Sequence, residues 1–305
     1  MSKKLCSLFL AALMVCCAVP VPAEGPAVAV TDMMGREIVL DAPVTRIVAL
    51  TAADCEILCA LGCEDVLVGR GEYCDYPASV LDKPSVQSGY ETNLEQIIAL
   101  QPQVVLMGTM AQTVEQVEAL EQAGIRVVVS DAQNIEGVYT AIRMIGALTG
   151  KDAEAEAIVA DMQAGFAEIA ERSQDTGKTV YFEVSPLQWG LWAAGKGTFM
   201  DEIAGLCGLT NLFEDMDGWV EVSEETVLAR NPDYIVTTAM YFGEGPTPVE
   251  EILSRDGWER LDAVMNDGIF NADSNAITRP GPRLLEAAWA LYEFVNGEAA
   301  EEPAA

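Results

Sequence analysis

Residues 94–106 read LEQIIALQPQVVL, and residues 224–236 read EETVLARNPDYIV, a second copy of the same pattern 130 positions later. In both copies a Glu, Glu95 or Glu225, precedes an apolar pair and Ala, then Pro, then a β-branched run. This order predicts a short amphipathic helix that ends at Pro, followed by a buried strand. Because solenoid repeats recur at a much shorter spacing, of about 20–50 residues, the pattern indicates two similar lobes. Two related lobes with a cleft between them suit a protein that clamps a ligand.

The bulk composition narrows the class of protein. The chain has 305 residues and is 50% hydrophobic, enough for two domains with real cores. Its formal charge is −31, from 48 acids against 17 bases, which argues against nucleic acid and anionic membrane surfaces as direct partners. The sequence contains no His. Ser-His-Asp hydrolysis, His-ligated zinc and haem held by His are therefore excluded.

The first 23 residues have the pattern of a secretion signal. A basic start at residues 3–4 precedes an apolar stretch at 5–19, and residues 21–23 supply the small residues of a cleavage site. Lipid attachment at Cys16 or Cys17 is the alternative. Both interpretations predict an exported protein, in the periplasm or on the outer face of the cytoplasmic membrane. We expect no other stretch to cross a membrane, since none is long and apolar enough.

The cysteines that follow the signal are odd in number. They are Cys55, Cys59, Cys63, Cys74 and Cys207. At least one thiol therefore stays free or pairs outside the chain. Three of them recur every four residues, which suits either a thiolate site or small apolar core positions on a helix. We favour the core interpretation, because no Cys-x-x-Cys spacing and no His complete a metal site.

Strands and helices alternate over residues 24–151, which predicts an α/β lobe with a mostly parallel sheet. The expected elements are a hairpin at 27–40, strands at 46–50, 66–69, 104–107 and 125–129, and helices at 52–61, 94–100 and 114–123. Residues 175–297 replay this order as a second α/β lobe, with a first strand at 179–184 and a closing helix at 283–296. The acidic tail at 298–305 is expected to be disordered.

Between the lobes lies one long amphipathic pattern. Ile158, Met162, Phe166 and Ile169 recur at helical spacing within residues 152–172, a length of about 30 Å at 1.5 Å per residue. We interpret residues 152–174 as a rigid helical linker. The alternative is an ordinary crossover helix inside one sheet, and the repeat favours the linker.

Aromatic side chains gather in segments that we expect to be loops, several of which leave the carboxyl ends of strands. They are Tyr73, Tyr76, Tyr90, Trp189, Trp192, Trp219, Tyr241 and Phe242. Ligands of open α/β sheets bind beyond the carboxyl ends of the strands, so these residues are predicted to line one pocket. The alternative for each of them is a local hydrophobic cap.

Two arginines, Arg279 and Arg283, flank a Pro-Gly-Pro loop in this acidic chain. A guanidinium can capture an anionic ligand group, and it can equally form a salt bridge with one of the many carboxylates. We favour the salt bridge for Arg283. The two repeat acids, Glu95 and Glu225, are either first-turn residues that favour the helix N-terminus or contacts for a partner with paired cations. Their duplication at one offset favours the partner.

Taken in order, these segments resemble the substrate-binding proteins of bacterial ABC importers for ferric siderophores, haem and cobalamin, over residues 28–297. The marks are Val30-Thr31-Asp32 with Gly35-Arg36, Arg46-Ile47-Val48, Asn93 to Pro102, Gly195-Lys196-Gly197, Glu225 to Pro232, and Arg279 to Arg283. The resemblance implies two Rossmann-like α/β lobes with mostly parallel sheets, joined by a long rigid α-helix, with the ligand cleft between the lobes. It also implies that Glu95 and Glu225 dock onto arginines of the membrane permease.

Members of this family that bind vitamin B12 show the strongest resemblance. Their pocket loop is similar to Tyr73-Cys74-Asp75-Tyr76-Pro77, and their corrin-facing aromatic and polar positions match Trp192, Trp219 and Arg279. Asn275 stands where those proteins have an acid, and Gly108 where they have an aromatic residue. Cobalamin, a ferric siderophore and haem therefore all remain candidate ligands. Haem would need Tyr or Met as its axial ligand.

We therefore expect an exported, monomeric binding protein that delivers a metal chelate to an ABC permease and has neither a resident cofactor nor a nucleic-acid partner. Tyr73, Tyr76, Tyr90, Trp192, Trp219, Tyr241, Asn275 and Arg279 are its predicted ligand contacts. The alternative function is an enzyme that acts on a cofactor or metal complex in the same cleft, with Glu183 near Tyr181 as its candidate residue. Direct binding of a bare metal ion is disfavoured by the absence of His.

Overall fold

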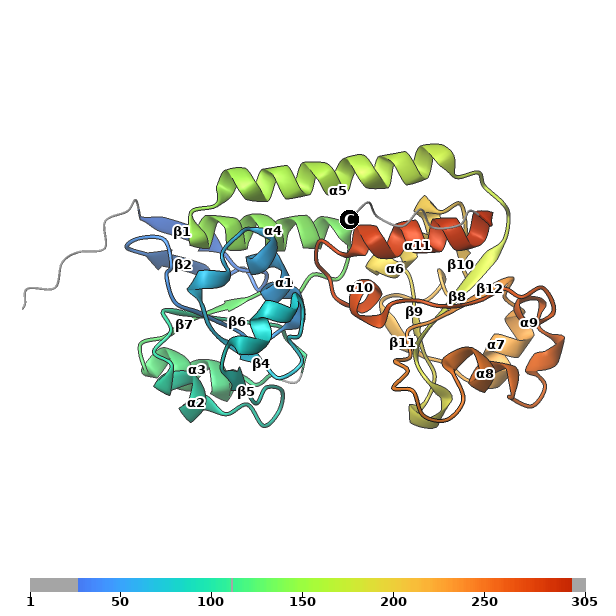
Figure 1. The fold of residues 1–305 in the computed structure, drawn as a ribbon, viewed down its shortest axis with the longest axis horizontal. Coiled ribbons are helices and arrows are strands. Elements are labelled where there is room, and N and C mark those ends of the chain that lie inside the picture. Colours follow the sequence, from blue (N-terminus) through green and yellow to red (C-terminus); the bar gives the residue numbers. More distant parts are fainter. Residues whose placement is uncertain (1–26, 111, 298–305) are drawn as a thin grey trace, which may run out of the picture.

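The computed structural model describes residues 27–110 and 112–297, which form two lobes side by side beneath one long helix (Figure 1). That helix is α5 (Asp152–Arg172), at the bounds the sequence pattern predicts. The predicted secretion signal, the lipid site at Cys16 or Cys17 and the acidic tail lie outside the described residues. Among the residues described, no helix is long and apolar enough to cross a membrane.

The N-terminal lobe contains a five-stranded, fully parallel sheet with strand order β5-β4-β3-β6-β7. Its strands are β3 (Ile47–Ala49), β4 (Leu67–Gly71), β5 (Ser85–Val86), β6 (Val104–Met107) and β7 (Arg126–Val129). The helices of this lobe are α1 (Ala52–Ala60), α2 (Leu94–Ala99), α3 (Val114–Gln122) and α4 (Ile135–Thr149), with 3-10 turns at 64–66 and 78–82. The predicted hairpin forms as β1 (Val28–Thr31) and β2 (Glu37–Leu40), paired antiparallel.

The C-terminal lobe has a mixed sheet. Its strands β8 (Thr179–Ser185), β12 (Tyr234–Thr237) and β13 (Ile269–Asn271) are parallel, and β10 (Thr210–Asn211) pairs with the start of β8. On the side of β8 away from β12, β9 (Trp192–Ala194) and then the edge strand β11 (Trp219–Glu221) are antiparallel additions. The prediction that Trp192 and Trp219 lie in loops is therefore wrong, because Trp192 belongs to the internal strand β9 and Trp219 to the edge strand β11. The helices here are α6 (Phe199–Leu206), α7 (Glu224–Arg230), α8 (Pro248–Leu253), α9 (Asp262–Met265), α10 (Ser274–Thr278) and α11 (Leu284–Asn296), with 3-10 turns at 187–189 and 258–260.

The sequence repeat is a structural repeat. Each copy is a short helix, α2 or α7, whose N-terminus is capped by the side chain of Asn93 or Ser223, followed by a central strand. The residue before Pro is left-handed in both copies, with φ 49° at Gln101 and 47° at Asn231. A residue before Pro is disfavoured in the α region, so this left-handed position ends the helix and turns the chain into the strand.

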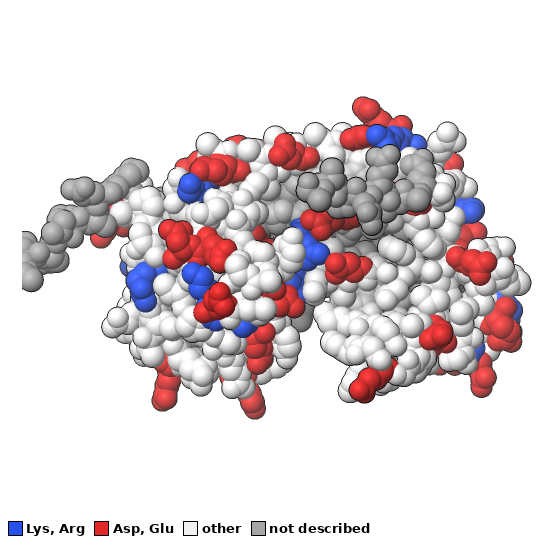
Figure 2. All heavy atoms as spheres, viewed as in Figure 1, with Lys and Arg blue, Asp and Glu red and all other residues white. Residues whose placement is uncertain are grey.

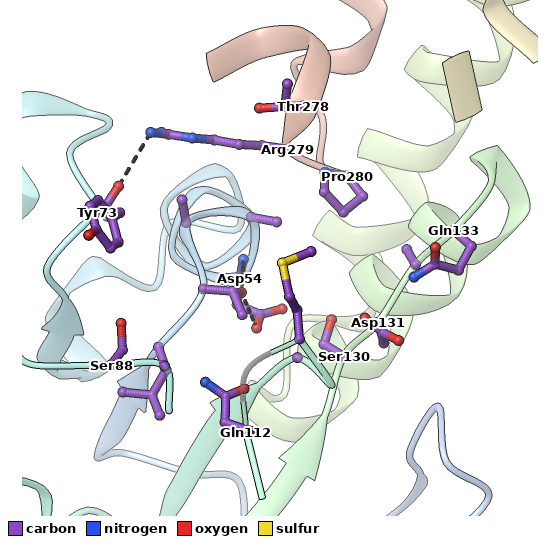
Figure 3. Close-up of a pocket in the computed structure, with 18 of the residues that line it drawn as sticks. Asp54, Tyr73, Ser88, Gln112, Ser130, Asp131, Gln133, Thr278, Arg279 and Pro280 are labelled. Atoms are coloured by element: carbon purple, nitrogen blue, oxygen red, sulfur yellow. Dashed lines mark hydrogen bonds between the residues drawn. The ribbon is translucent and has the colours of Figure 1, made fainter. Parts of the chain in front are cut away.

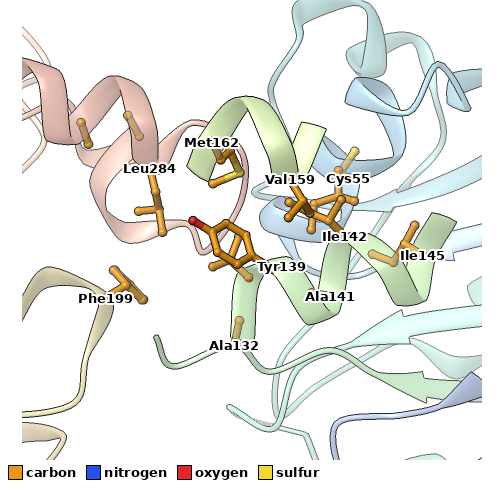
Figure 4. Packing of buried hydrophobic residues seen from close by; sticks show 14 of the residues in the cluster. Cys55, Ala132, Tyr139, Ala141, Ile142, Ile145, Val159, Met162, Phe199 and Leu284 are labelled. Atoms are coloured by element: carbon orange, nitrogen blue, oxygen red, sulfur yellow. The ribbon is translucent and has the colours of Figure 1, made fainter. Parts of the chain in front are cut away.

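A single hydrophobic cluster extends through both lobes beneath α5. It joins residues of α1 and α4 in the first lobe to residues of α6 and α11 in the second (Figure 4). Met162 and Phe166 of α5 lie buried in this cluster. Two smaller clusters cover the other face of each sheet. The linker is therefore part of a shared core, which agrees with the prediction that it is rigid.

All five described cysteines are free thiols. Cys55 and Cys63 are buried members of the shared core, and Cys59 packs against it. Because α1 ends at Ala60, Cys63 lies beyond the helix and the three thiols do not share one helical face. Burial raises the pKa of the Cys63 and Cys207 thiols, to about 12 for Cys207, which suits inert core positions. Among the described residues, no group of three His, Cys, Asp or Glu is arranged to hold a metal ion.

Candidate functional site

A cavity of about 410 Å³ lies between the lobes, at the carboxyl ends of the N-lobe strands. Leu50, Gly108 and Ser130 line it, and each of them directly follows one of the strands β3, β6 and β7. The opposite wall comes from the second lobe, through Phe199, Trp219 and the segment 278–280. Figure 2 shows a hollow between the lobes on the side away from α5. This is the position where open α/β sheets bind their ligands.

Asp54 forms part of the cavity wall although its side chain is almost fully buried, with 1% exposed (Figure 3). Its position follows from helix capping: the Thr51 hydroxyl accepts from the Asp54 backbone N–H and donates to Oδ2 at 2.5 Å. Oδ1 makes no hydrogen bond of normal geometry, although the nearby Ser130 hydroxyl lowers the pKa somewhat. Burial outweighs these donors and raises the pKa of Asp54 to about 6.

Further acceptors surround Asp54. Asp131 follows β7 and accepts a hydrogen bond from the Thr109 hydroxyl at 2.6 Å. The side-chain oxygen of Gln112 is buried and has no partner. Both residues line the cavity and lie near Asp54 in Figure 3. This part of the wall therefore presents the half-buried Asp131 carboxylate, while the unpartnered oxygens of Asp54 and Gln112 lie beneath its surface.

Arg279 lies at the cavity, as predicted, but it is already occupied. One guanidinium nitrogen contacts Glu56 at 2.7 Å and Asp75 at 2.8 Å, and the other donates to the Tyr73 carbonyl at 3.3 Å (Figure 3). Only 10% of the Arg279 side chain is exposed. Arg279 thus ties α10 of the second lobe to the loop after β4 of the first. Arg283 forms the predicted salt bridges, with Asp273 at 3.0 Å and Glu286 at 3.1 Å.

Aromatic side chains supply the flat surfaces of the cavity. The Trp219 ring packs edge-to-face on Phe199 at 5.2 Å, and its N–H donates to the Gln133 side chain at 2.9 Å. These contacts fix the indole before any ligand arrives. Tyr73 projects from the opposite lobe and is 74% exposed. A planar or ring-shaped ligand could therefore contact an aromatic face from each lobe.

The second lobe has a cavity of its own, of about 700 Å³, at the carboxyl ends of β8 and β12. Tyr241 lines it, together with the exposed Trp189 and Phe242. Glu244 and Glu251 are its charged residues. The structure thus divides five of the eight predicted aromatic residues between two cavities, each at the carboxyl edge of one sheet.

Four predicted ligand contacts line neither cavity. Tyr76 lies under the Arg283 guanidinium, 4.2 Å from its ring centre, and Tyr90 is exposed in the loop before α2. Trp192 is the first residue of β9, an internal strand of the second sheet. Asn275 sits in the first turn of α10, and its side-chain oxygen is buried without a partner.

Glu95 and Glu225 are exposed first-turn residues of α2 and α7. Among the described side chains, neither of them takes part in a salt bridge. Hydrogen bonds to its own backbone and to Ser223 lower the pKa of Glu225, so this carboxylate stays ionised near neutral pH. In Figure 1, α2 and α7 both lie on the side of the molecule away from α5.

The candidate residues of the enzyme alternative are inside the protein. Glu183 is buried and bonded to Arg255 at 2.7 and 3.0 Å, and Glu251 completes the ion-pair cluster. The Tyr181 hydroxyl is buried without a partner, and burial raises its pKa well above the ordinary value. A substrate in either cavity could reach neither group, so the geometry gives these residues a structural role.

Sequence reasoning missed Asp54, Gln112 and Asp131. A Thr-x-x-Asp pattern directly after a predicted strand was the available signal for Asp54, since it places a capped helix N-terminus at the carboxyl edge of the sheet. Asp131 also follows a predicted strand end. Gln112 carries no such signal.

Comparisons with known proteins agree with this geometry. A family model described as periplasmic binding protein matches residues 47–276. The chain is 32% identical to an uncharacterised ABC transporter substrate-binding lipoprotein, YvrC, of Bacillus subtilis, over 90% of this chain and 87% of that protein. It is 28% identical to a vitamin B12-binding protein of Vibrio campbellii, over 80% and 87% of the two chains. A solved structure from Staphylococcus epidermidis, described as a possible iron-binding, periplasmic solute-binding protein, is 29% identical with a TM-score of 0.71, over 83% and 98%.

Proposed function

The chain belongs to the periplasmic binding protein family, and from that premise we propose that it is the extracytoplasmic substrate-binding component of an ABC importer. Its cargo is a metal-chelate nutrient, either a corrinoid or a ferric siderophore. The observation that carries this proposal is the interlobe cavity, which presents Tyr73 from one lobe and Trp219 from the other. The vitamin B12-binding and possible iron-binding relatives support the class of cargo.

Export fits this role, because an importer collects its cargo outside the cytoplasmic membrane. The Bacillus subtilis relative is named a lipoprotein, which supports an anchor at Cys16 or Cys17 as an alternative to a cleaved, freely secreted form. We propose that residues 24–151 and 175–297 are the two ligand-clamping lobes and that residues 152–174 connect them. A monomer that exposes both repeat helices is the form we expect to meet the permease.

Binding is tested by titrating the intrinsic Trp fluorescence of the purified protein with cyanocobalamin, ferric siderophores and haem. Trp219 lies in the cavity wall, so an occupied cavity is expected to quench its emission saturably at submicromolar ligand. The variant Trp219→Leu should lose this signal and bind about two- to tenfold more weakly, because aromatic contacts contribute about 0.5–1.5 kcal/mol beyond area burial. Absence of saturable binding by every chelate would contradict the proposal.

Docking is tested separately with Glu95→Ala combined with Glu225→Ala. These two exposed carboxylates, one on each lobe, are proposed to pair with cations of the permease, so the double variant should abolish uptake and leave ligand affinity unchanged. Asp161→Ala with Glu171→Ala is the control, because it removes the same charge from exposed positions on α5. A large loss of ligand affinity in the docking variant, or equal loss of uptake in the control, would refute the docking role.

A further inference from the structure

Most of the charged residues that line the two cavities are acidic. Asp54 and Asp131 line the interlobe cavity, and Glu244 and Glu251 line the cavity of the second lobe. Among the described lining residues, Arg279 is the sole Lys or Arg. An anionic ligand placed in the cleft would therefore depend on Arg279 for its charge partner.

Arg279 cannot serve that purpose without breaking existing bonds. Its guanidinium contacts Glu56 at 2.7 Å and Asp75 at 2.8 Å, so its positive charge is already paired with two carboxylates. The Glu56 side chain is 3% exposed, and if Arg279 turned toward a ligand the remaining cation would be Arg283, at the longer distance of 3.9 Å. Such a rearrangement opposes anion capture, because removing one partner of a buried ion pair is strongly unfavourable.

The cavity instead contains buried acceptors without donors. Asp54 Oδ1 lacks a hydrogen bond of normal geometry although the residue is 99% buried in the wall, and the Gln112 oxygen is also unpartnered. Helix capping explains why an acid stands at position 54, but capping uses only Oδ2. These two oxygens are closed off from the cavity, so a ligand there meets the half-buried Asp131, whose carboxylate can only accept and lies close to Asp54 in Figure 3.

We infer that the cleft selects an uncharged or cationic metal chelate that presents hydrogen-bond donors to Asp131, and that the negative charges of Asp54 and Asp131 exclude chelates that present anionic groups there. This inference rests on the proposed function and narrows its cargo. Amide-bearing corrinoids and neutral or cationic hydroxamate siderophores fit the description. Haem, with its propionates, and ferric catecholates, with their high negative charge, do not.

The test uses pairs of chelates that differ at one group. Cyanocobalamin is compared with its isolated monocarboxylic acids, in which one side-chain amide is a carboxylate. Ferrioxamine B, which carries an ammonium group, is compared with its succinylated form, which carries a carboxylate. Affinities are measured by isothermal titration calorimetry, with haem and ferric enterobactin as anionic references. For the chelate that binds, the carboxylate form is expected to bind roughly tenfold to hundredfold more weakly, as for like charges several ångströms apart at an effective dielectric of about 20.

The double variant Asp54→Asn with Asp131→Asn tests whether these two carboxylates cause the difference in affinity within a ligand pair. It should reduce the difference within a ligand pair to less than about threefold, because the repelling charges are gone. Asp161→Asn with Glu171→Gln changes the net charge equally on exposed positions of α5 and should keep the full difference. The ligand pairs on the unmodified protein decide the question even if the double variant fails to fold.

The outcomes separate the two proposals. Binding of haem or ferric enterobactin as tightly as the neutral and cationic chelates, or equal binding within a ligand pair, would overturn the charge selection and leave the chelate-binding function standing. Absence of binding by every chelate would refute the proposed function and the charge selection with it.

Discussion

The Asp54 carboxylate should destabilise the protein near neutral pH, and Asp54→Asn should reveal by how much. Burial raises the pKa of this group from its ordinary value of 3.8 to about 6. One pKa unit is equivalent to about 1.4 kcal/mol, so the shift corresponds to about 3 kcal/mol. The pKa of Asp54 is higher in the folded state than in the unfolded state. The contribution of Asp54 to the free energy of unfolding is therefore most favourable below about pH 4, and it falls by about 3 kcal/mol as the pH rises through about 6.

The neutral Asn has nearly the same shape and can still accept from the Thr51 hydroxyl. We therefore expect Asp54→Asn to raise the free energy of unfolding by up to about 3 kcal/mol at about pH 7.5, and by close to zero at about pH 4. The measurement is urea unfolding followed by circular dichroism at several pH values across this range. All other titrating groups are common to both proteins, so they cancel in the difference between the two curves.

The exposed variant Asp161→Asn is the control and should show a small difference that does not depend on pH. If Asp54→Asn is less stable than the unmodified protein at about pH 7.5, or if the difference is the same at every pH, the reasoning is wrong. A stabilising change at a cavity-lining position would also support a functional role, because sites that bind ligands commonly retain groups that cost stability.

Arg255→Met should lower the free energy of unfolding by about 3–5 kcal/mol, because it leaves the buried Glu183 carboxylate without its partner, and adding Glu183→Gln should recover part of the loss in urea unfolding. Gly146→Ala should cost about 1–3 kcal/mol, since a methyl group there would lie 2.6 Å from the Cβ of Ala155 on α5. Gly165→Ala is its matched control and should be close to neutral, because the atoms it meets belong to a flexible leucine side chain on α11 and Ala favours the helix. Equal effects of the two glycine changes would contradict this account of helix packing.

Much of the fold was accessible from the sequence because its signals are local. The amphipathic pattern of α5 and the paired repeats at α2 and α7 depend on residues within a few turns of one another. The short strands of Trp192 and Trp219 were missed for the same reason. Each strand has three residues, too few to show a period of two, and its hydrogen bonds come from a distant segment.

The site was predictable in position and less so in chemistry. The carboxyl ends of the predicted strands indicated where the cleft lies, and Tyr73, Trp219 and Arg279 line it. The state of Arg279 depends on Glu56, 223 positions away in the sequence, and no local pattern encodes that pairing. The buried oxygen of Asp54 likewise exists only once helix α1, the strand ends and the second lobe have come together.

The packing of α5 explains why fixed groups in the cleft should determine selectivity. Helix α5 packs closely on α4 at Gly146 and on α11 at Gly165. Both lobes are therefore packed against one rigid helix. A wide hinge motion would expose the hydrophobic cluster that the lobes share beneath α5, at about 25 cal/mol for each Å² of apolar surface. Closure on the ligand should therefore be small. A protein that closes little cannot reshape its walls around different charges, so the charges already present at Asp54 and Asp131 must discriminate between ligands.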